Sequence, residues 1–245
     1  MRFHADLFIF FIVTLLAEVL GTIGGFGSSV FFVSFSQFLF DFKEVLALTG
    51  LLHIFSNSSK IFLFRKTIDW RLVVRVGISS VVLAVVGAYL SATMDFAYAK
   101  LVLGFFLTGF AVFFLIRPDF VLRQSVGNAV SGGAIAGFLA GLVGTGGAIR
   151  GLVLASFNLE KNLFVGTSAA IDMGVDLSRT AIYFFNDYTD ETRWFYIPLL
   201  MVASFFGSYL GKIILEKIPQ EKFKTLVLVL ILTMGLTIMA GWLRV

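Results

Sequence analysis

The chain has 245 residues, of which 58% are hydrophobic and only 14% are charged, and its formal net charge is +4. A soluble domain carries about 25% charged residues, so this composition excludes an ordinary soluble enzyme or a soluble nucleic-acid-binding domain. The sequence contains no cysteine, which excludes disulfide and thiol chemistry.

The apolar residues form two series of four segments, separated by short charged or helix-breaking stretches. The segments cover residues 5–40, 44–64, 71–91, 97–117, 126–157, 161–185, 194–215 and 222–243. Several of them reach about 20 residues, the length at which an α-helix crosses a hydrocarbon core of about 30 Å. The sequence therefore predicts an all-α polytopic membrane protein with a single transmembrane domain, residues 1–245.

The first segment, residues 5–40, contains the glycine cluster Gly24-Gly25-Phe26-Gly27-Ser28. As one helix this segment would be about 54 Å long, which is too long for one crossing and too short for two. Glycine permits the positive φ angles and the close approach that a sharp turn requires. We therefore expect a re-entrant hairpin of two half-helices that turns at this cluster.

A second glycine cluster, Val143-Gly144-Thr145-Gly146-Gly147, follows the first by 119 residues and lies in the segment 126–157. The same offset relates the polar faces of the next two segments, which carry Thr49, His53, Asn57 and Lys60, then Ser168, Asp172, Asp176 and Arg179. A duplicated chain with helix breaks at matching points is typical of secondary transporters. We therefore predict two repeats, residues 5–117 and 126–243.

The placement of basic residues predicts the orientation of these repeats. If both first segments are re-entrant, each half crosses the membrane three times and most flanking Lys and Arg residues gather on one side, as the positive-inside rule requires. The other side then keeps only Arg2, Lys43, Lys100, Arg193 and Arg244. Because three is odd, the two halves would be inverted repeats in a cell membrane.

The glycine clusters are candidate anion sites. In a hairpin the second half-helix begins near the membrane midplane, where its free N–H groups and the positive end of its dipole can bind an anion. The candidate ligands are Gly25, Gly27, Ser28, Ser29, Gly144, Thr145, Gly146 and Gly147. The alternative is that these glycines only permit close helix packing. Their repetition at matching positions favours the anion site.

Ionisable side chains inside membrane segments are costly and usually line a pathway or pair with one another. Asn57, Lys60 and Arg179 are the candidate ligands for an anionic substrate on the two polar faces. The alternatives are that Lys60 extends to the membrane interface and that Arg179 forms a structural pair with Asp176. Asp172 and Asp176 are candidates for a proton relay, or for neutralising Arg179 within their helix.

Three further assignments concern residues near the two clusters. His53 can titrate near neutral pH, although a structural role is an equal alternative. Arg150, just past the second cluster, either adds positive charge to the site or pairs with an aspartate. Glu18, about two turns before the first cluster, is a candidate for proton coupling.

Enzyme and cofactor chemistry has little support in the sequence. Gly27-Ser28 with His53 suggests an intramembrane serine protease, but that interpretation leaves the second half without a role. Two histidines and no cysteines provide too few ligands for a typical zinc or copper site, and no Walker loop is present. We therefore expect no catalytic residue, no metal and no cofactor.

These motifs resemble the sulfite exporter TauE/SafE family of membrane permeases, whose halves each begin with a G-x-G-G-G motif. Gly144-Thr145-Gly146-Gly147-Ala148 is close to that pattern, and Gly24-Gly25-Phe26-Gly27-Ser28 is a degenerate copy. Asp69-Trp70-Arg71 and Gly87-Ala88-Tyr89-Leu90 are also similar to the first half of the family. The sequence departs from it by lacking the usual proline after each cluster. The resemblance implies transport of sulfite, sulfonates or related anions across the cytoplasmic membrane.

The leading hypothesis is a secondary transporter that binds a small sulfur-containing anion between the two glycine clusters and exposes it alternately to each side. Its partners would be that anion and the lipid bilayer, with no nucleic acid; a homodimer is left open. One rival is a passive anion channel. The other is a proton-coupled or cation-coupled carrier of a non-anionic solute that uses Asp172 and Asp176.

Overall fold

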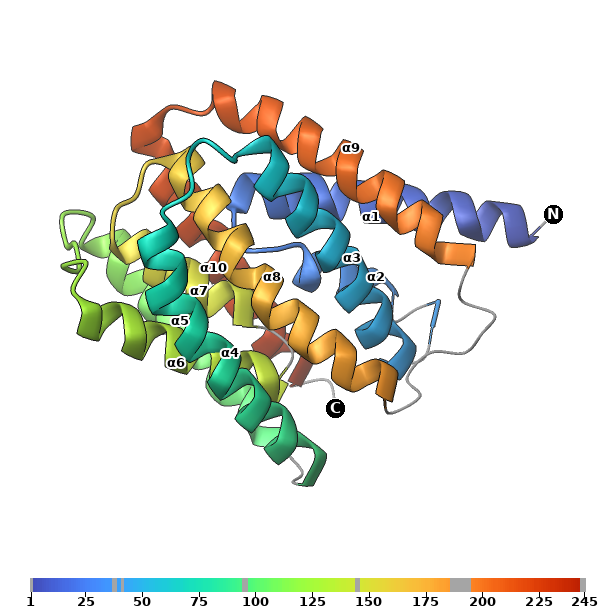
Figure 1. Cartoon of the computed structure of the whole chain (residues 1–245), viewed down its shortest axis with the longest axis horizontal. Coiled ribbons are helices and arrows are strands. Elements are labelled where there is room, and N and C mark those ends of the chain that lie inside the picture. Colours follow the sequence, from blue (N-terminus) through green and yellow to red (C-terminus); the bar gives the residue numbers. More distant parts are fainter. Residues whose placement is uncertain are drawn as a thin grey trace.

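A computed structural model of the chain describes residues 2–36, 39–40, 42–93, 97–143, 146–185 and 195–242. The described residues form ten α-helices and no strand (Figure 1). These are α1 (Arg2–Gly24), α2 (Ser29–Ser36), α3 (Phe42–Leu63), α4 (Trp70–Thr93), α5 (Ala97–Ile116), α6 (Val126–Val143), α7 (Gly146–Ser156), α8 (Lys161–Phe185), α9 (Tyr196–Lys217) and α10 (Gln220–Trp242).

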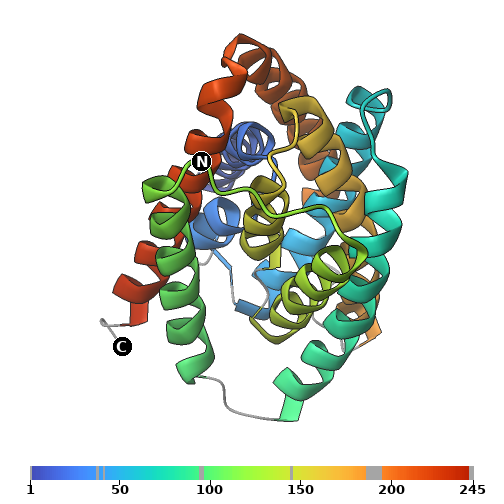
Figure 2. The same cartoon turned by 90° about the vertical axis from the view of Figure 1, so that its left-hand side faces the viewer.

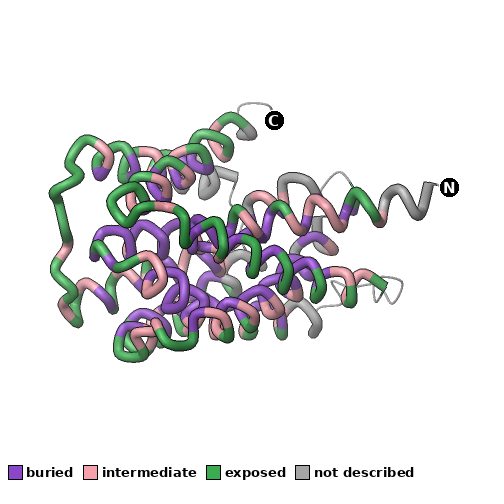
Figure 3. Tube along the Cα trace, turned by 90° about the horizontal axis from the view of Figure 1, so that it is seen from above, coloured by how far each residue is buried: buried purple, intermediate pink, exposed green. Residues whose placement is uncertain are grey.

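Helices of membrane-spanning length and composition confirm the predicted all-α membrane class. Among the described residues, the candidate spans are Leu7–Gly24, Trp70–Gly87, Tyr196–Lys217 and Gln220–Ala240. The helices α3 and α8 carry the polar faces and do not qualify as spans on composition. Figure 3 shows buried residues along the middle of the bundle and exposed ones on its outer helices, where many side chains are large and apolar. Such an outer surface suits contact with lipid.

The polar helices α3 and α8 lie against each other in the middle of the bundle (Figure 1). On one side of them α1 packs along α9, and on the other side α4 packs along α6. The helix α3 also contacts α9, and α8 also contacts α4. Figure 2 shows α5 and α10 side by side at one edge of the molecule. The two polar faces are therefore shielded from the surface by apolar helices.

Glycines permit the closest of these helix contacts. A Cβ on Gly207 of α9 would lie 2.5 Å from the Cβ of Glu18 on α1, and a Cβ on Gly137 of α6 would collide with the backbone of Ser80 on α4. The Oγ of Ser80 also donates a hydrogen bond to the Gly133 carbonyl, at 2.8 Å. Small residues of this kind let membrane helices approach each other closely.

The helix break at the first glycine cluster is present. The helix α1 ends at Gly24, Gly25 and Gly27 have φ angles of 69° and 102°, and α2 begins at Ser29. The two arms differ in length: the 23 residues of α1 measure about 34 Å and the 8 residues of α2 about 12 Å. The first arm is therefore long enough to cross a membrane by itself.

The second cluster lies between α6, which ends at Val143, and α7, which begins at Gly146. Gly144 and Thr145, both predicted anion ligands, lie outside the described residues. The helices α6 and α7 contact each other, as α1 and α2 do. The chain order of helices in residues 126–242 thus matches that in residues 2–116: two helices on either side of a glycine cluster, followed by three more helices.

Candidate functional site

The first part of the candidate site is a hydrogen-bonded network around Glu18, which is fully buried on α1. Its carboxylate accepts hydrogen bonds from the Oγ of Ser28 and the Oγ of Ser56. The Nζ of Lys60 lies 3.3 Å from the same carboxylate and 2.6 Å from the Ser56 Oγ. Since Ser28 directly precedes α2, the carboxylate lies at the positive end of this helix dipole.

The second part joins α3 to α8 through Asp176. Its carboxylate accepts a hydrogen bond of 2.8 Å from the Nδ2 of Asn57, and it lies 3.2 Å from the Nδ1 of His53. Within α8, the Nε of Arg179 is 2.7 Å from the Asp176 carboxylate. All four side chains are buried. The 119-residue offset seen in the sequence relates Asn57 to its own partner, Asp176.

The third part joins α7 to α8 through Arg150. A terminal nitrogen of its guanidinium pairs with the carboxylate of Asp172, and its Nε donates a hydrogen bond of 3.2 Å to the Ser168 Oγ. Arg150 and Asp172 are both buried. Of the two sequence-based alternatives for Arg150, the pairing with an aspartate is therefore the one found.

The two glycine clusters meet next to these networks. A Cβ on Gly147 would collide with the Phe26 carbonyl, and a Cβ on Gly151 would lie 2.8 Å from the Cβ of Phe26. A Cβ on Gly25 would lie 2.7 Å from the ring of Phe164 on α8. Gly147 thus permits close packing between the clusters, whereas Gly25 combines a tight contact with a positive φ angle.

Gly27 faces the imidazole of His53, since a Cβ built on Gly27 would lie 3.6 Å from the His53 Cε1. The Nε2 of this ring is buried and has no hydrogen-bond partner among the described residues. On the other side of the ring, Nδ1 lies 3.1 Å from a terminal nitrogen of Arg179 as well as 3.2 Å from Asp176. Nδ1 can accept from Arg179 when it is unprotonated or donate to Asp176 when it is protonated, but not both.

Charge is balanced within this cluster. The three bases Lys60, Arg150 and Arg179 each have a carboxylate partner, and the three acids are Glu18, Asp172 and Asp176. With His53 neutral, the six ionised groups sum to zero. Asp172 also lies within electrostatic range of Asp176, His53 and Lys60, which links the three networks to each other.

The structure brings together most of the residues singled out from the sequence. Lys60 is buried and paired with Glu18, so the alternative that it extends to the membrane interface is wrong. Thr49, the first residue of that polar face, donates instead to the Val45 carbonyl of its own helix, at 2.6 Å. Ser29 is buried at the start of α2.

Ser56 is the main residue that the sequence reasoning missed. Its position three residues after His53 and four before Lys60 puts it on the predicted polar face, and this spacing was the available signal. A small hydroxyl side chain in an apolar helix seldom attracts attention, because it often bonds to the carbonyl four residues earlier, as Ser58 does.

Among the described residues, no group of three or more His, Asp and Glu side chains is arranged so that it could hold a metal ion. The acids of the candidate site are instead engaged with bases and hydroxyl groups. The arrangement is suited to holding charge in a low-dielectric interior.

Comparison with known proteins identifies one family. The family model described as "Sulfite exporter TauE/SafE" matches residues 10–238, which is nearly the whole chain. No curated protein and no solved structure matches the chain. The match includes every residue of the buried cluster of acids and bases. The chain therefore belongs to the sulfite exporter TauE/SafE family of membrane transporters.

Proposed function

We propose that the protein is a secondary transporter of a small sulfur-containing oxyanion, such as sulfite or a sulfonate, in the cell membrane. The substrate binds where the two glycine clusters meet the polar faces of α3 and α8. Its candidate ligands are Gly25, Gly27, Ser28, Ser29, Asn57, Lys60, Gly144, Thr145, Gly146, Gly147, Arg150 and Arg179. The family match supports the transport of a sulfur anion.

One observation supports this location of the site: the carboxylate of Glu18 is an oxyanion that already occupies a set of hydrogen-bond donors. It receives hydrogen bonds from Ser28 and Ser56 and pairs with Lys60, at the N-terminus of α2. Hydroxyl groups, an ammonium and a helix N-terminus are the donors that a sulfite or sulfonate requires. A substrate oxyanion would compete with Glu18 for these donors.

Charge balance supports a coupling role for the acids and for His53. The paired acids and bases of the site sum to zero charge, so an arriving monovalent anion would leave one uncompensated negative charge in a low-dielectric interior, which is costly. A proton bound by His53, Glu18, Asp172 or Asp176 restores neutrality. His53 is the first choice, because its Nε2 has no protein partner among the described residues and the ring faces Gly27.

Alternating access would arise from two inverted repeats whose glycine-broken segments meet at the site. Corresponding helix contacts support the repeats: α1 packs on α9 as α4 packs on α6, and α3 contacts α9 as α8 contacts α4. The pairing of Asn57 with Asp176 joins two equivalent positions. Movement of one half against the other would then expose the central site to each side in turn.

Counterflow into liposomes tests this proposal. Liposomes containing the purified protein and loaded with unlabelled sulfite should accumulate labelled sulfite against its gradient. Lys60→Gln and Arg179→Gln should reduce the rate by about 100-fold, the effect expected when a charge-assisted contact is lost. The matched control is Arg123→Gln, which removes an exposed arginine far from the cluster in sequence and should leave counterflow unchanged.

Three other results would contradict the proposal. Normal counterflow in Arg179→Gln would remove this arginine from the anion site. Flux that is passive and shows no counterflow would identify a channel. Uptake of only a neutral or cationic solute, abolished by Asp172→Asn and Asp176→Asn, would make those carboxylates the binding groups of a different carrier.

A further inference from the structure

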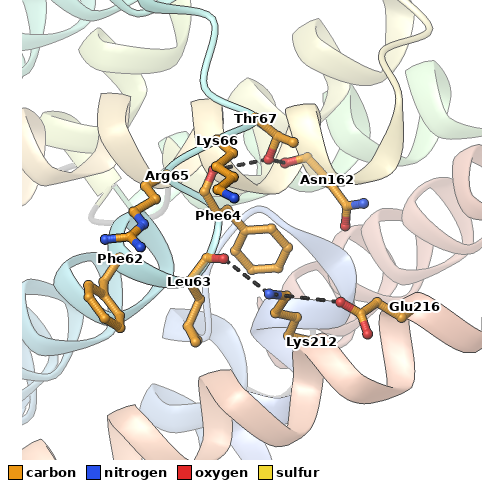
Figure 4. Close-up of a pocket in the computed structure, with 9 residues that line it drawn as sticks. All are labelled: Phe62, Leu63, Phe64, Arg65, Lys66, Thr67, Asn162, Lys212 and Glu216. Atoms are coloured by element: carbon orange, nitrogen blue, oxygen red, sulfur yellow. Dashed lines mark hydrogen bonds and ion pairs between the residues drawn. The ribbon is translucent and has the colours of Figure 1, made fainter.

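A cavity opens at one end of the bundle and is lined by none of the residues of the buried cluster. Its volume is about 430 Å³, and it lies between the end of α3, the connection that follows it, the start of α8 and the last turns of α9 (Figure 4). The residues that line it are Phe62, Leu63, Phe64, Arg65, Lys66, Thr67, Asn162, Lys212 and Glu216. No step of the proposed transport uses these residues.

Positive charge dominates this cavity. Arg65 and Lys66 are exposed and have no carboxylate partner among the described residues, and the Arg65 guanidinium lies 5.3 Å from the centre of the Phe62 ring. The third base, Lys212, lies 3.8 Å from Glu216, the one acid of the lining. Three bases and one acid leave an excess of two positive charges around the cavity.

The floor of the cavity is fixed in place by hydrogen bonds. Lys212 donates to the Leu63 carbonyl at 3.1 Å and lies 5.4 Å from the centre of the Phe64 ring, as Figure 4 shows. Thr67 donates to the carbonyls of Phe64 and Asn162 at 3.0 and 3.2 Å, which ties the connection to the start of α8. The bases thus surround a preformed hollow.

The surroundings of the cavity are typical of the boundary between membrane and water. Trp70, which opens α4 just after the connection, is exposed, as interfacial tryptophans are. Phe62 and Ile213 are exposed apolar side chains on the two helices that flank the cavity. Nearby, Lys161 caps the end of α9 by donating to the Leu215 and Ile218 carbonyls at 3.0 and 2.6 Å.

We propose that this cavity binds a tetrahedral oxyanion, a phosphate or a sulfur oxyanion, at the membrane surface. Such an anion would be held by Arg65 and Lys66, with Lys212 behind it; an arginine can bind two of its oxygens at once. Basic pockets between membrane helices favour phosphate head groups in this way.

Two sources can supply this chemistry. One is the head group of an acidic phospholipid, whose chains would lie along the exposed apolar side chains of α3 and α9. The other is a free anion on its way to the central site, since Lys60 lies one helical turn from Phe64, whose N–H bonds to the Lys60 carbonyl at 2.8 Å. Only the second source rests on the proposed transport function.

Binding measurements on the delipidated protein in a neutral detergent test the cavity. The ligands are short-chain phosphatidylglycerol, the matching phosphatidylcholine, inorganic phosphate and sulfite, and the readout is the shift in thermal unfolding. The test variant is Arg65→Gln/Lys66→Gln, which breaks no hydrogen bond between described residues. The matched control, Arg71→Gln/Arg75→Gln, removes two exposed arginines of α4 that do not line the cavity.

We expect an oxyanion ligand to raise the unfolding temperature of the wild type and of the control variant. The dissociation constant should increase by tenfold or more in Arg65→Gln/Lys66→Gln. A response to phosphatidylglycerol alone assigns the cavity to a lipid. A response to free phosphate or sulfite that persists in Arg179→Gln assigns it to a free anion and separates it from the central site.

The proposal is overturned if no oxyanion stabilises the protein through these residues. One such result is an equal loss of ligand-induced stabilisation in both double variants, which would indicate diffuse surface charge. The other is a ligand-induced stabilisation that is undiminished in Arg65→Gln/Lys66→Gln. Failure of the central site is distinguishable, because it would abolish counterflow while leaving the response of the cavity to phosphatidylglycerol intact.

Discussion

The two halves of the chain each connect a polar central helix to their own glycine-broken segment through a buried ion pair, but with opposite polarity. In the first half, the acid Glu18 lies before the break and pairs with Lys60 on α3. In the second half, the base Arg150 lies after the break and pairs with the acid Asp172 on α8. The two pairs do not occupy corresponding positions, because the offset of 119 residues relates Lys60 to Arg179 and Asp172 to His53. Each half therefore holds its polar helix against its glycine-broken segment with a buried ion pair of its own.

The largest effect should come from removing one acid in each half. Asp172→Asn leaves the Arg150 guanidinium buried without its partner and should lower the free energy of unfolding by about 3–5 kcal/mol, because arginine does not lose its proton in proteins. Glu18→Gln should cost less, because a buried lysine such as Lys60 can become neutral. Chemical unfolding in detergent micelles measures both.

Removing both partners provides the control for this comparison. Asp172→Asn/Arg150→Gln takes away the unpaired charge and should recover most of the stability lost in Asp172→Asn. Equal destabilisation by Asp172→Asn and Glu18→Gln would contradict the distinction between arginine and lysine. If the double variant also recovers counterflow, the pair is structural and does not belong to the anion site.

The next comparison concerns the two glycine clusters, where different constraints apply. Gly147→Ala has no room, because its Cβ would collide with the Phe26 carbonyl, and overpacking of this kind costs roughly 1–3 kcal/mol. Gly27→Ala has room beside His53 but a φ angle of 102°, so its cost is conformational and near the lower end, about 1–2 kcal/mol. A larger loss of unfolding free energy in Gly27→Ala would show that strain outweighs packing.

A substitution at His53 tests whether the two halves differ in proton binding, since the equivalent position of the second half is Asp172. If His53 binds the compensating proton, an imposed proton gradient should drive sulfite uptake in the wild type and should no longer drive it in His53→Gln, because the glutamine side chain binds no proton. Proton-driven uptake that persists in His53→Gln would assign the proton to one of the carboxylates.

Much of the fold could be predicted from the sequence, because helix length, apolar composition and glycine placement are local properties. The all-α membrane class and the family were predicted and are confirmed. The break after Gly24 was also predicted, but the unequal arms were not, since 23 residues of α1 remain helical before it. Cluster spacing marks a break but does not fix the length of either arm.

The sequence predicted which residues form the site, but it did not predict which of them pair with each other. Helical spacing put His53, Asn57 and Lys60 on one face, and this follows from sequence alone. The pairing of Lys60 with Glu18 depends on how α1 and α3 are rotated and how deep each lies. Those quantities are set by tertiary contacts, such as that between Gly207 and Glu18.

The smallest predicted effect compares the hydroxyl groups that support the two ion pairs. Ser56 both accepts from Lys60 and donates to Glu18, whereas Ser168 only accepts from the Arg150 Nε, at 3.2 Å. Ser56→Ala leaves a buried donor and a buried acceptor short of one partner each, so it should cost about 1–3 kcal/mol of unfolding free energy. Ser168→Ala should cost about 0.5–1.5 kcal/mol, since Arg150 keeps its carboxylate. Matched unfolding curves for the two variants measure the difference. Equal losses of unfolding free energy would contradict this prediction. They would mean that the Ser56 hydroxyl supports the Glu18–Lys60 pair no more than the Ser168 hydroxyl supports the Arg150–Asp172 pair.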